Sequence, residues 1–153
     1  MTWPTPPIGS LCENAVQRDP RQCPDEFFRY IDISSIDRNR KTITEAASII
    51  GSDAPSRARK EVRYADVLVS TVRPNLNTIA QIDDTALDGE IASTGFCVLR
   101  PRSVLLVSRY LFYYCQTPLF IEEVTKSVRG AHYPAVSDTD VKSVRIPLPL
   151  PSE

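Results

Sequence analysis

Basic and amide side chains gather in three short stretches of this sequence: Ser56 to Lys60, Arg73 to Asn77, and Lys126 to Pro134. An arginine guanidinium makes planar, bidentate contacts with a phosphate or with guanine O6 and N7, and an asparagine amide pairs in the same way with adenine. Lysine and histidine side chains add contacts to the phosphate backbone. The residues that could make such contacts are Ser56, Arg57, Arg59, Lys60, Arg73, Asn75, Asn77, Lys126, Arg129 and His132.

For each of these residues alone, a solvent-exposed loop charge is a sufficient explanation. The distribution of charge adds information. The 153 residues carry 18 Lys and Arg against 19 Asp and Glu, so the net charge is −1, which excludes a polycation that binds nucleic acid by bulk attraction. Residues 38–63, however, have a net charge of +4, and residues 76–99 have a net charge of −4. Fourteen of the 18 basic residues are arginine, a composition that suits an anion-facing surface and also follows from GC-rich coding.

Catalytic chemistry finds little support in the residues. His132 is the only histidine, so neither a Ser-His-Asp triad nor a histidine-rich metal site can be built. A metal nuclease remains a minor alternative, because such an enzyme would need a pattern such as PD…(D/E)xK. Pro24-Asp25 is followed by Glu61-Val62-Arg63, in which arginine occupies the lysine position of that pattern. We therefore expect a protein that is not an enzyme and holds no metal or cofactor of its own.

The four cysteines fit no common zinc spacing. Cys97 and Cys115 lie in apolar runs and are predicted to be buried, while Cys12 and Cys23 could pair but are expected to be free thiols. The sequence has no readable signal peptide and no run of 18 apolar residues, so we expect a cytoplasmic protein with no membrane partner.

Hydrophobic periodicity predicts a sheet built early and helices added late. Apolar residues alternate in five segments that we interpret as strands: 28–33, 63–71, 78–83, 91–100 and 144–150. A buried helix is predicted over residues 103–116. Thr117-Pro118 then caps a second helix to about residue 126, and Ser137 to Asp140 resembles a capping box. We predict an α+β fold: a twisted, mostly antiparallel sheet with long loops, one of them running from 34 to 63.

These motifs, in this order, resemble a known family. The segments are RYIDISSIDRNRKTI, APSRARKEVRYADVLVSTVRPNLNTIAQID, STGFCVLRP, YLFYYCQTPLF and SVRGAHYPAVSDTDVKSVRIPLPLP. Together they resemble a target recognition domain of the specificity subunit (HsdS) of Type I restriction-modification systems. The resemblance covers roughly residues 8–151. It rests on the combination of SRAR, DVLVSTVRP and the C-terminal IPLP rather than on any single motif.

The resemblance implies a non-catalytic domain that binds double-stranded DNA and reads one half of a bipartite target. The implied partners are an adenine methyltransferase (M) subunit, a restriction (R) subunit and a second specificity domain. S-adenosylmethionine and ATP would belong to those partner subunits. Ser56, Arg57, Arg59 and Arg73 match framework positions of the family, whereas Asn75, Arg129 and His132 lie in loops that vary with the DNA target.

In the family, a helix that forms a coiled spacer follows the IPLP stretch, and this sequence ends at Glu153. We therefore expect residues 1–153 to form one recognition domain without the spacer. The alternative is a protein-interaction or scaffold module without DNA contact, in which the aromatic YLFYYC helix would be a partner surface. Clustering of Arg57, Arg59, Arg73 and Arg129 on one face would favour DNA, and their dispersal would favour the scaffold.

Overall fold

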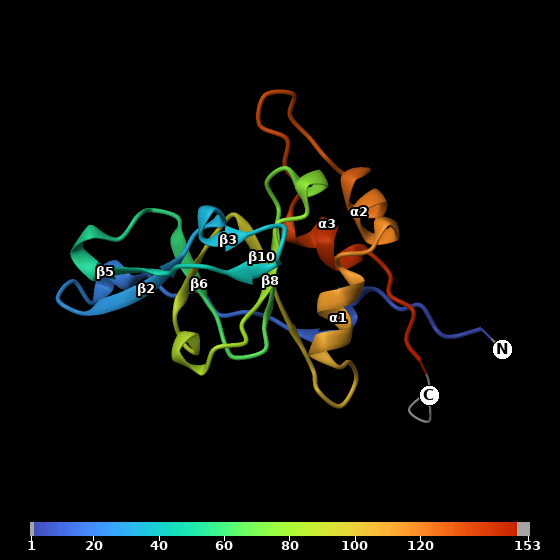
Figure 1. The fold of residues 1–153 in the computed structure, drawn as a ribbon, viewed down its shortest axis with the longest axis horizontal. Coiled ribbons are helices and arrows are strands. Elements are labelled where there is room, and N and C mark those ends of the chain that lie inside the picture. Colours follow the sequence, from blue (N-terminus) through green and yellow to red (C-terminus); the bar gives the residue numbers. More distant parts are fainter. Residues whose placement is uncertain (1, 150–153) are drawn as a thin grey trace.

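The computed structural model describes residues 2–149, whose strands form two four-stranded sheets and a hairpin (Figure 1). The first sheet is antiparallel throughout and has the order β1-β10-β7-β8. Its strands are β1 (Cys12–Glu13), β7 (Val67–Ser70), β8 (Ile79–Gln81) and β10 (Phe96–Pro101).

The second sheet has the order β5-β2-β9-β6, with β2 and β9 parallel and the other neighbours antiparallel. Its strands are β2 (Phe27–Ile31), β5 (Ala47–Ile50), β6 (Ala58–Glu61) and β9 (Ile91–Ser93). Strands β3 (Ile36–Asp37) and β4 (Thr42–Ile43) make the separate hairpin.

Helices follow the strands in the chain, as predicted. They are α1 (Ser108–Tyr114), α2 (Pro118–Thr125) and α3 (Asp138–Ser143). Short 3₁₀ helices precede β1 or lie between strands: η1 (Ile8–Leu11), η2 (Pro20–Gln22), η3 (Ile33–Ser35), η4 (Gly51–Asp53), η5 (Pro74–Leu76) and η6 (Thr85–Leu87). None of the helices within residues 2–149 has the length and apolar character needed to cross a bilayer. The α+β prediction is confirmed.

The central strands are buried on both faces, which explains their continuous apolar sequence. Val67 and Val69 of β7 point to one side, as the alternation predicted, and Leu68 points to the other. Side chains of β10 divide in the same way, with Cys97 and Leu99 on the first side. One hydrophobic cluster therefore lies under the helices, and a second lies between the first sheet and the β2–β9 region.

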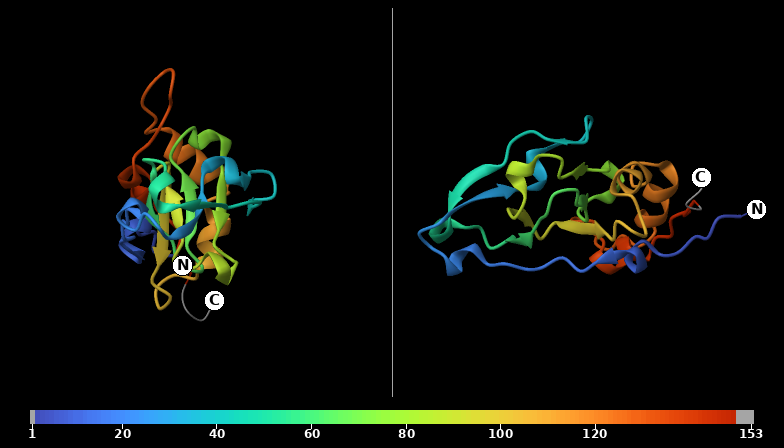
Figure 2. Two further views of the ribbon diagram at one scale, coloured as in Figure 1. Left: turned by 90° about the vertical axis from the view of Figure 1, so that its left-hand side faces the viewer. Right: turned by 90° about the horizontal axis from the view of Figure 1, so that it is seen from below.

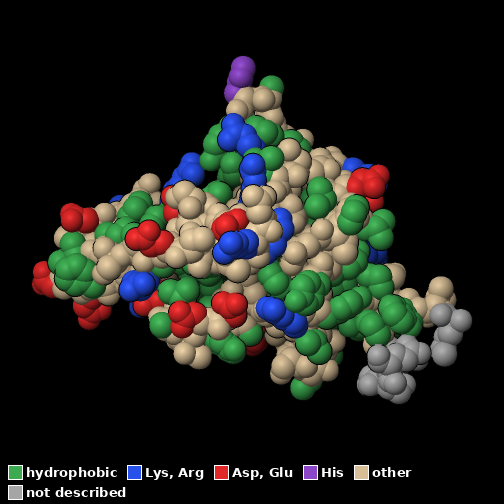
Figure 3. Space-filling model, in the orientation of Figure 1, with side chains coloured by type: hydrophobic (Ala, Val, Ile, Leu, Met, Phe, Trp, Pro, Cys, Tyr) green, Lys and Arg blue, Asp and Glu red, His purple; other side chains and the backbone are tan. Residues whose placement is uncertain are grey.

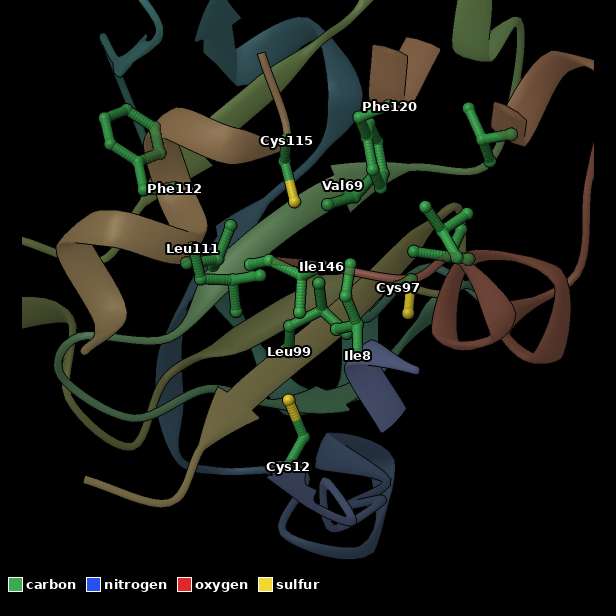
Figure 4. Close-up of a cluster of buried hydrophobic side chains, with 14 of the residues drawn as sticks. Ile8, Cys12, Val69, Cys97, Leu99, Leu111, Phe112, Cys115, Phe120 and Ile146 are labelled. Atoms are coloured by element: carbon green, nitrogen blue, oxygen red, sulfur yellow. The ribbon is translucent and has the colours of Figure 1, made fainter. Parts of the chain in front are cut away.

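Figure 4 shows the cluster beneath the helices. Leu111 of α1 and Phe120 of α2 point toward Val69 and Leu99, and Ile146 reaches the same cluster from the C-terminal segment (Figure 4). The two ends of the described chain run side by side, because the N–H of residue 146 donates to the carbonyl of Pro6 at 3.0 Å and residue 148 pairs similarly with Pro4 (Figures 1 and 2). All three helices thus cover one face of β7 and β10.

Both predicted helix starts are confirmed. Thr117 Oγ1 accepts a hydrogen bond from the N–H of Phe120 at 3.3 Å, and Pro118 occupies the first helical position. At α3, Ser137 Oγ accepts from the Asp140 N–H at 3.1 Å, while an Asp140 carboxylate oxygen accepts from the Ser137 N–H at 2.8 Å. An aspartate therefore closes this capping box in place of the usual glutamate.

Three predictions about the strands were wrong. The segment 34–63 is not a loop, because it contains β3, β4, β5 and β6, whose two to four residues are too short to show a period. The predicted strand 91–100 is two strands in different sheets, separated at Thr94-Gly95. Residues 144–149 form no named strand; they pair with the N-terminal segment, and Leu150 lies outside the described residues.

Gly95 lies at the break between β9 and β10. A Cβ atom there would lie 2.8 Å from Ile33 Cδ1, so a larger residue would have to displace the end of the Ile33 side chain. The predicted helix over 103–116 also begins later, at Ser108. Arg102 accounts for part of the difference, because its carbonyl accepts the N–H groups of Leu105 and Leu106 in a separate turn.

A buried charge ties the second sheet to the first sheet and α3. Lys60 of β6 is only 9% exposed, and its Nζ donates to the carbonyl of Phe96 at 2.6 Å and to Asp138 Oδ2 at 2.5 Å. Two of its three N–H donors are engaged within the fold, and the side chain is buried. The prediction that Lys60 contacts a phosphate therefore does not fit its position.

All four thiols are free, and Cys12, Cys97 and Cys115 are buried while Cys23 is exposed. Burial raises the pKa of Cys12 to about 11 and that of Cys97 to about 12. The pKa of Cys115 is also raised well above its ordinary value by burial. The thiolate is the reactive form of cysteine. In the native state these three residues are therefore unreactive for two reasons: reagents cannot reach them, and their raised pKa keeps them as thiols.

Lys60→Ala should lower the free energy of unfolding by about 1–3 kcal/mol, because the Phe96 carbonyl would lose its buried donor. Chemical denaturation followed by circular dichroism measures the change. Lys126→Ala is the matched control, since the ion pair of Lys126 with Glu123 is exposed and should contribute less than about 1 kcal/mol. Equal stability of the two variants would contradict the structural role of Lys60.

Titration of the native protein with a thiol reagent such as Ellman's reagent should detect one reactive cysteine, Cys23. Titration in denaturant should detect four, because unfolding exposes the other three. Cys23→Ser should remove the native signal altogether. A native count above one in the wild type would show that the helical layer over β7 and β10 opens more readily than its packing implies.

Candidate nucleic-acid interface

An exposed tyrosine lies between two arginines contributed by distant parts of the chain. The guanidinium carbons of Arg57 and Arg73 are each 6.0 Å from the centroid of the Tyr133 ring. Arg57 Nη1 also donates a hydrogen bond of 3.3 Å to the Tyr133 hydroxyl. We call these three residues the Arg57–Tyr133–Arg73 cluster. They come from the segments before β6, after β7 and between α2 and α3.

The electrostatics of the cluster favour an anion. Two cations held against one aromatic ring are attracted to its π face, yet they repel each other. The hydrogen bond to Tyr133 raises the pKa of Arg57 further, so this guanidinium stays charged. All three side chains are exposed to solvent. An anion placed beside both guanidinium groups would relieve their repulsion.

Backbone hydrogen bonds place Tyr133 next to Arg73. The N–H of Arg73 donates to the Pro134 carbonyl at 2.9 Å, and the N–H of Val136 donates to the Thr71 carbonyl at the same distance. The segment 129–135 is itself closed by reciprocal bonds of 3.0 Å between Arg129 and Ala135. It forms the projection at the top of Figure 1, and the single histidine, His132, lies at its tip (Figure 3).

Gly130 is needed within this projection. Its φ of +88° lies in the left-handed region, and a Cβ atom there would come within 2.8 Å of the Tyr133 carbonyl oxygen. The absence of a side chain at Gly130 therefore allows two parts of the protein's own backbone to approach closely.

The loop after β7 holds two residues in a conformation that L-amino acids seldom adopt. Arg73 has φ +45° and Asn77 has φ +53°, at the two ends of η5. Asn77 is buried and its Nδ2 donates to the Cys115 carbonyl at 2.9 Å, so it is not available to read a base, contrary to the sequence-based suggestion. Asn75 lies between them and is exposed. Such backbone strain is common at functional sites.

Arg59 is paired with an acidic residue outside the cluster. Its Nη1 lies 2.7 Å from Asp19 Oδ2, and its Nε donates to the Ser56 carbonyl at 3.3 Å. Hydrogen bonds from Arg21 and from Arg59 lower the pKa of Asp19 to about 2, so the carboxylate partner is charged. Ser56 itself is exposed beside Arg57. The charge of Arg59 is thus partly offset by the carboxylate of Asp19.

The other predicted cations of the third stretch are exposed but paired. Lys126 contacts Glu123 at 2.7 Å, and Arg129 contacts Asp140 at 2.9 Å while its side chain stays 72% exposed. Exposed ion pairs of this kind are weak and exchange readily with other partners. Arg129 therefore lies at the base of the projection and is accessible, whereas Lys126 lies at the end of α2.

The structure brings together part of the predicted set and adds one residue that sequence reasoning missed. Arg57 and Arg73 meet, Arg129 and His132 share the projection, and Lys60 is buried. The missed residue is Tyr133. An aromatic side chain in the exposed, basic stretch from Lys126 to Pro134 was the available signal. Within residues 2–149, no three His, Cys, Asp or Glu side chains are grouped as metal ligands.

Comparison with known proteins gives a consistent result. The chain is 24% identical over 151 residues to the specificity subunit of the Type I restriction enzyme HindI from Haemophilus influenzae, a match that covers 96% of this chain and 32% of that protein. It is 40% identical to the HsdS subunit of Thermoanaerobacter tengcongensis in a crystal structure, with a TM-score of 0.89, covering 96% of this chain and 38% of the other.

A second solved structure addresses complex assembly and conformational transition of the type I R-M system. Its matching chain is 42% identical, with a TM-score of 0.92, and the match covers 99% of this chain and 39% of the other. The present chain thus spans less than two-fifths of the length of each of these relatives. Residues 7–153 match the family model of the Type I restriction modification DNA specificity domain, and the chain belongs to that family.

Proposed function

We propose that residues 1–153 form one recognition domain that reads one half of a bipartite, double-stranded DNA target without catalysing a reaction itself. Family membership makes it a DNA specificity domain. The observation that carries the finer proposal is the exposed Arg57–Tyr133–Arg73 cluster, in which three segments converge on an anion-binding geometry. Its chemistry matches the phosphates of a DNA backbone.

In this mechanism the cluster fixes the position of the domain on the duplex. Guanidinium groups form bidentate hydrogen bonds with phosphate oxygens, and such contacts set register without reading sequence. Contact with Tyr133 would restrict the motion of both guanidinium groups before binding and so lower the conformational entropy that they lose on binding. Exposed residues around the cluster, including Asn75 and Arg129, are then held near the base edges.

We further propose that the domain acts within a larger assembly. Its partners would be an adenine methyltransferase subunit, a restriction subunit and a second specificity domain, in the cytoplasm. S-adenosylmethionine and ATP would be bound by the partner subunits. Because enzymes that modify a base must take it out of the stack, the methyltransferase would flip the adenine while this domain holds the duplex in register.

A scaffold without DNA contact is the second candidate, and one observation favours it. Several apolar side chains before and along the first two helices are exposed: Val104, Leu105, Val107, Tyr113 and Leu119. The aromatic helix is otherwise part of the core, since Leu111, Phe112 and Cys115 are buried. Of the four arginines that discriminate the candidates, Arg57 and Arg73 cluster, while Arg59 and Arg129 pair with acids.

Arg57→Ala and Arg73→Ala should each weaken DNA binding by about tenfold, since a hydrogen bond to a charged group contributes about 1.5–3 kcal/mol. The DNA would be a duplex selected by the wild-type chain from a random pool, and fluorescence anisotropy would give the dissociation constants. Arg102→Ala is the matched control, because Arg102 is exposed in the segment between β10 and α1. If both cluster variants bind normally and their thermal unfolding is unchanged, the DNA must bind another face of the domain.

Salt dependence tests the electrostatic part of the proposal. If about five arginine and lysine side chains contact phosphates, the logarithm of the binding constant should fall with the logarithm of salt concentration at a slope near −4.5. Removing one phosphate contact, as in Arg57→Ala, should reduce the magnitude of that slope by about 1. An interaction that does not respond to salt would be inconsistent with phosphate contacts.

A further inference from the structure

The turn between β3 and β4 presents three unengaged polar side chains. Arg38, Asn39 and Arg40 form its tip and are exposed. Their backbone is fixed, because Asp37 Oδ1 accepts the N–H groups of Asn39 and Arg40 at 3.0 and 3.1 Å. Within residues 2–149, the side chains of the three tip residues make no hydrogen bond or ion pair. They are therefore free to bind a ligand.

The base of this hairpin is anchored in the core. Ile36 and Ile43 face each other across the two strands, and both pack into the hydrophobic cluster that contains Leu68. The N–H of Lys41 donates to the Asp37 carbonyl at 2.7 Å and closes the turn, with Lys41 itself at a left-handed φ of +59°. A rigid base under an unengaged tip is the arrangement expected of a contact element.

A second bond joins the hairpin to the candidate interface. Lys41 Nζ donates to the Asn77 carbonyl at 2.6 Å, and Asn77 closes the η5 turn that begins at Arg73. Positive charge is crowded here, because Arg38, Arg40 and Lys41 lie within four residues, and burial and the charge of Arg38 lower the pKa of Lys41. In Figure 3, Lys and Arg side chains lie below the projecting histidine and again in the middle of the same face, where Figure 1 shows β3.

We propose that the β3–β4 hairpin reads base edges in the major groove through Arg38, Asn39 and Arg40. A two-stranded β-ribbon fits the major groove of B-DNA, where arginine recognises guanine and asparagine recognises adenine by bidentate hydrogen bonds. This inference rests on the proposed function and assigns a different part of DNA binding to each of two elements. The Arg57–Tyr133–Arg73 cluster holds phosphates, and the hairpin distinguishes bases.

The neutral residue in the tip separates this role from simple charge attraction. An acidic protein surface would be satisfied by Arg38 and Arg40 alone, as would a phosphate backbone. Asn39 lies between them on the same fixed turn and adds no charge. Its amide carries both the donor and the acceptor that adenine N7 and N6 require.

The test compares the DNA motifs selected from a random pool by the wild-type chain and by two variants. Arg38→Lys combined with Arg40→Lys keeps the charge but removes the bidentate fork. It should lower the preference for the selected duplex over single-base-pair mismatches by about tenfold, at G·C positions. Asn39→Ala should do the same at an A·T position. Binding to unrelated DNA and the salt slope should not change, and Arg102→Ala should select the wild-type motif.

The outcomes separate the hairpin from the rest of the interface. If both variants select the wild-type motif with unchanged mismatch ratios, the hairpin proposal is overturned, and a loss of binding in Arg57→Ala would still support the proposed function. If the wild-type chain selects no motif, both proposals fail. If the variants keep the motif but lose association with a methyltransferase subunit, the hairpin contacts protein instead, which also overturns the inference.

Discussion

The hydrogen bond from the Arg73 N–H to the Pro134 carbonyl joins the two loops on which the candidate interface depends. Together with the bond from the Val136 N–H to the Thr71 carbonyl, it fixes the position of Tyr133 relative to Arg73, although the two residues are 60 positions apart in the chain. The bond can form because β7 and the segment after α2 are both held by the same core. Val69 of β7 packs in the hydrophobic cluster that also contains Phe120 and Val124 of α2 and Val136, which precedes α3. Packing beneath the loops therefore determines which polar groups meet above them.

The central strands impose a second constraint. Because β7 and β10 are covered on both faces, neither can present a side chain for binding from its middle. The polar side chains that could bind a ligand therefore lie in segments at strand ends: Arg73 follows β7, and Arg57 precedes β6. Of the four non-glycine residues with positive φ among residues 2–149, Lys41, Arg73 and Asn77 lie in or beside the η5 loop, and the fourth, Ala65, precedes β7. Core packing offsets this strain and holds the loops in one arrangement, which a domain that must discriminate between sequences requires.

Much of the fold can be predicted from the sequence, and the reasons are local. Thr117-Pro118 and the Ser137–Asp140 box identify their helices because capping depends on residues three positions apart. The burial of Cys97 and Cys115 follows from their apolar neighbours. The strands of segment 34–63 could not be predicted, because two-residue strands such as β3 have no period and exist only through partners elsewhere. The division of 91–100 between two sheets leaves no local signal, because β9 pairs with β2 and β6 whereas β10 pairs with β1 and β7.

The same contrast between local signals and distant contacts applies to the candidate site. Residue type identified Arg57 and Arg73, since exposed arginines in loops are predictable from composition and pattern. Residue type could not show that Lys60 is consumed by Phe96 and Asp138, or that Arg59 is turned toward Asp19, because those partners are distant in sequence. The most direct test of the interface is a structure of the chain bound to its selected duplex. We predict that guanidinium nitrogens of Arg57 and Arg73 lie about 3 Å from phosphate oxygens, with Tyr133 between them. A complex in which the Arg57–Tyr133–Arg73 cluster faces solvent, away from the duplex, would contradict it.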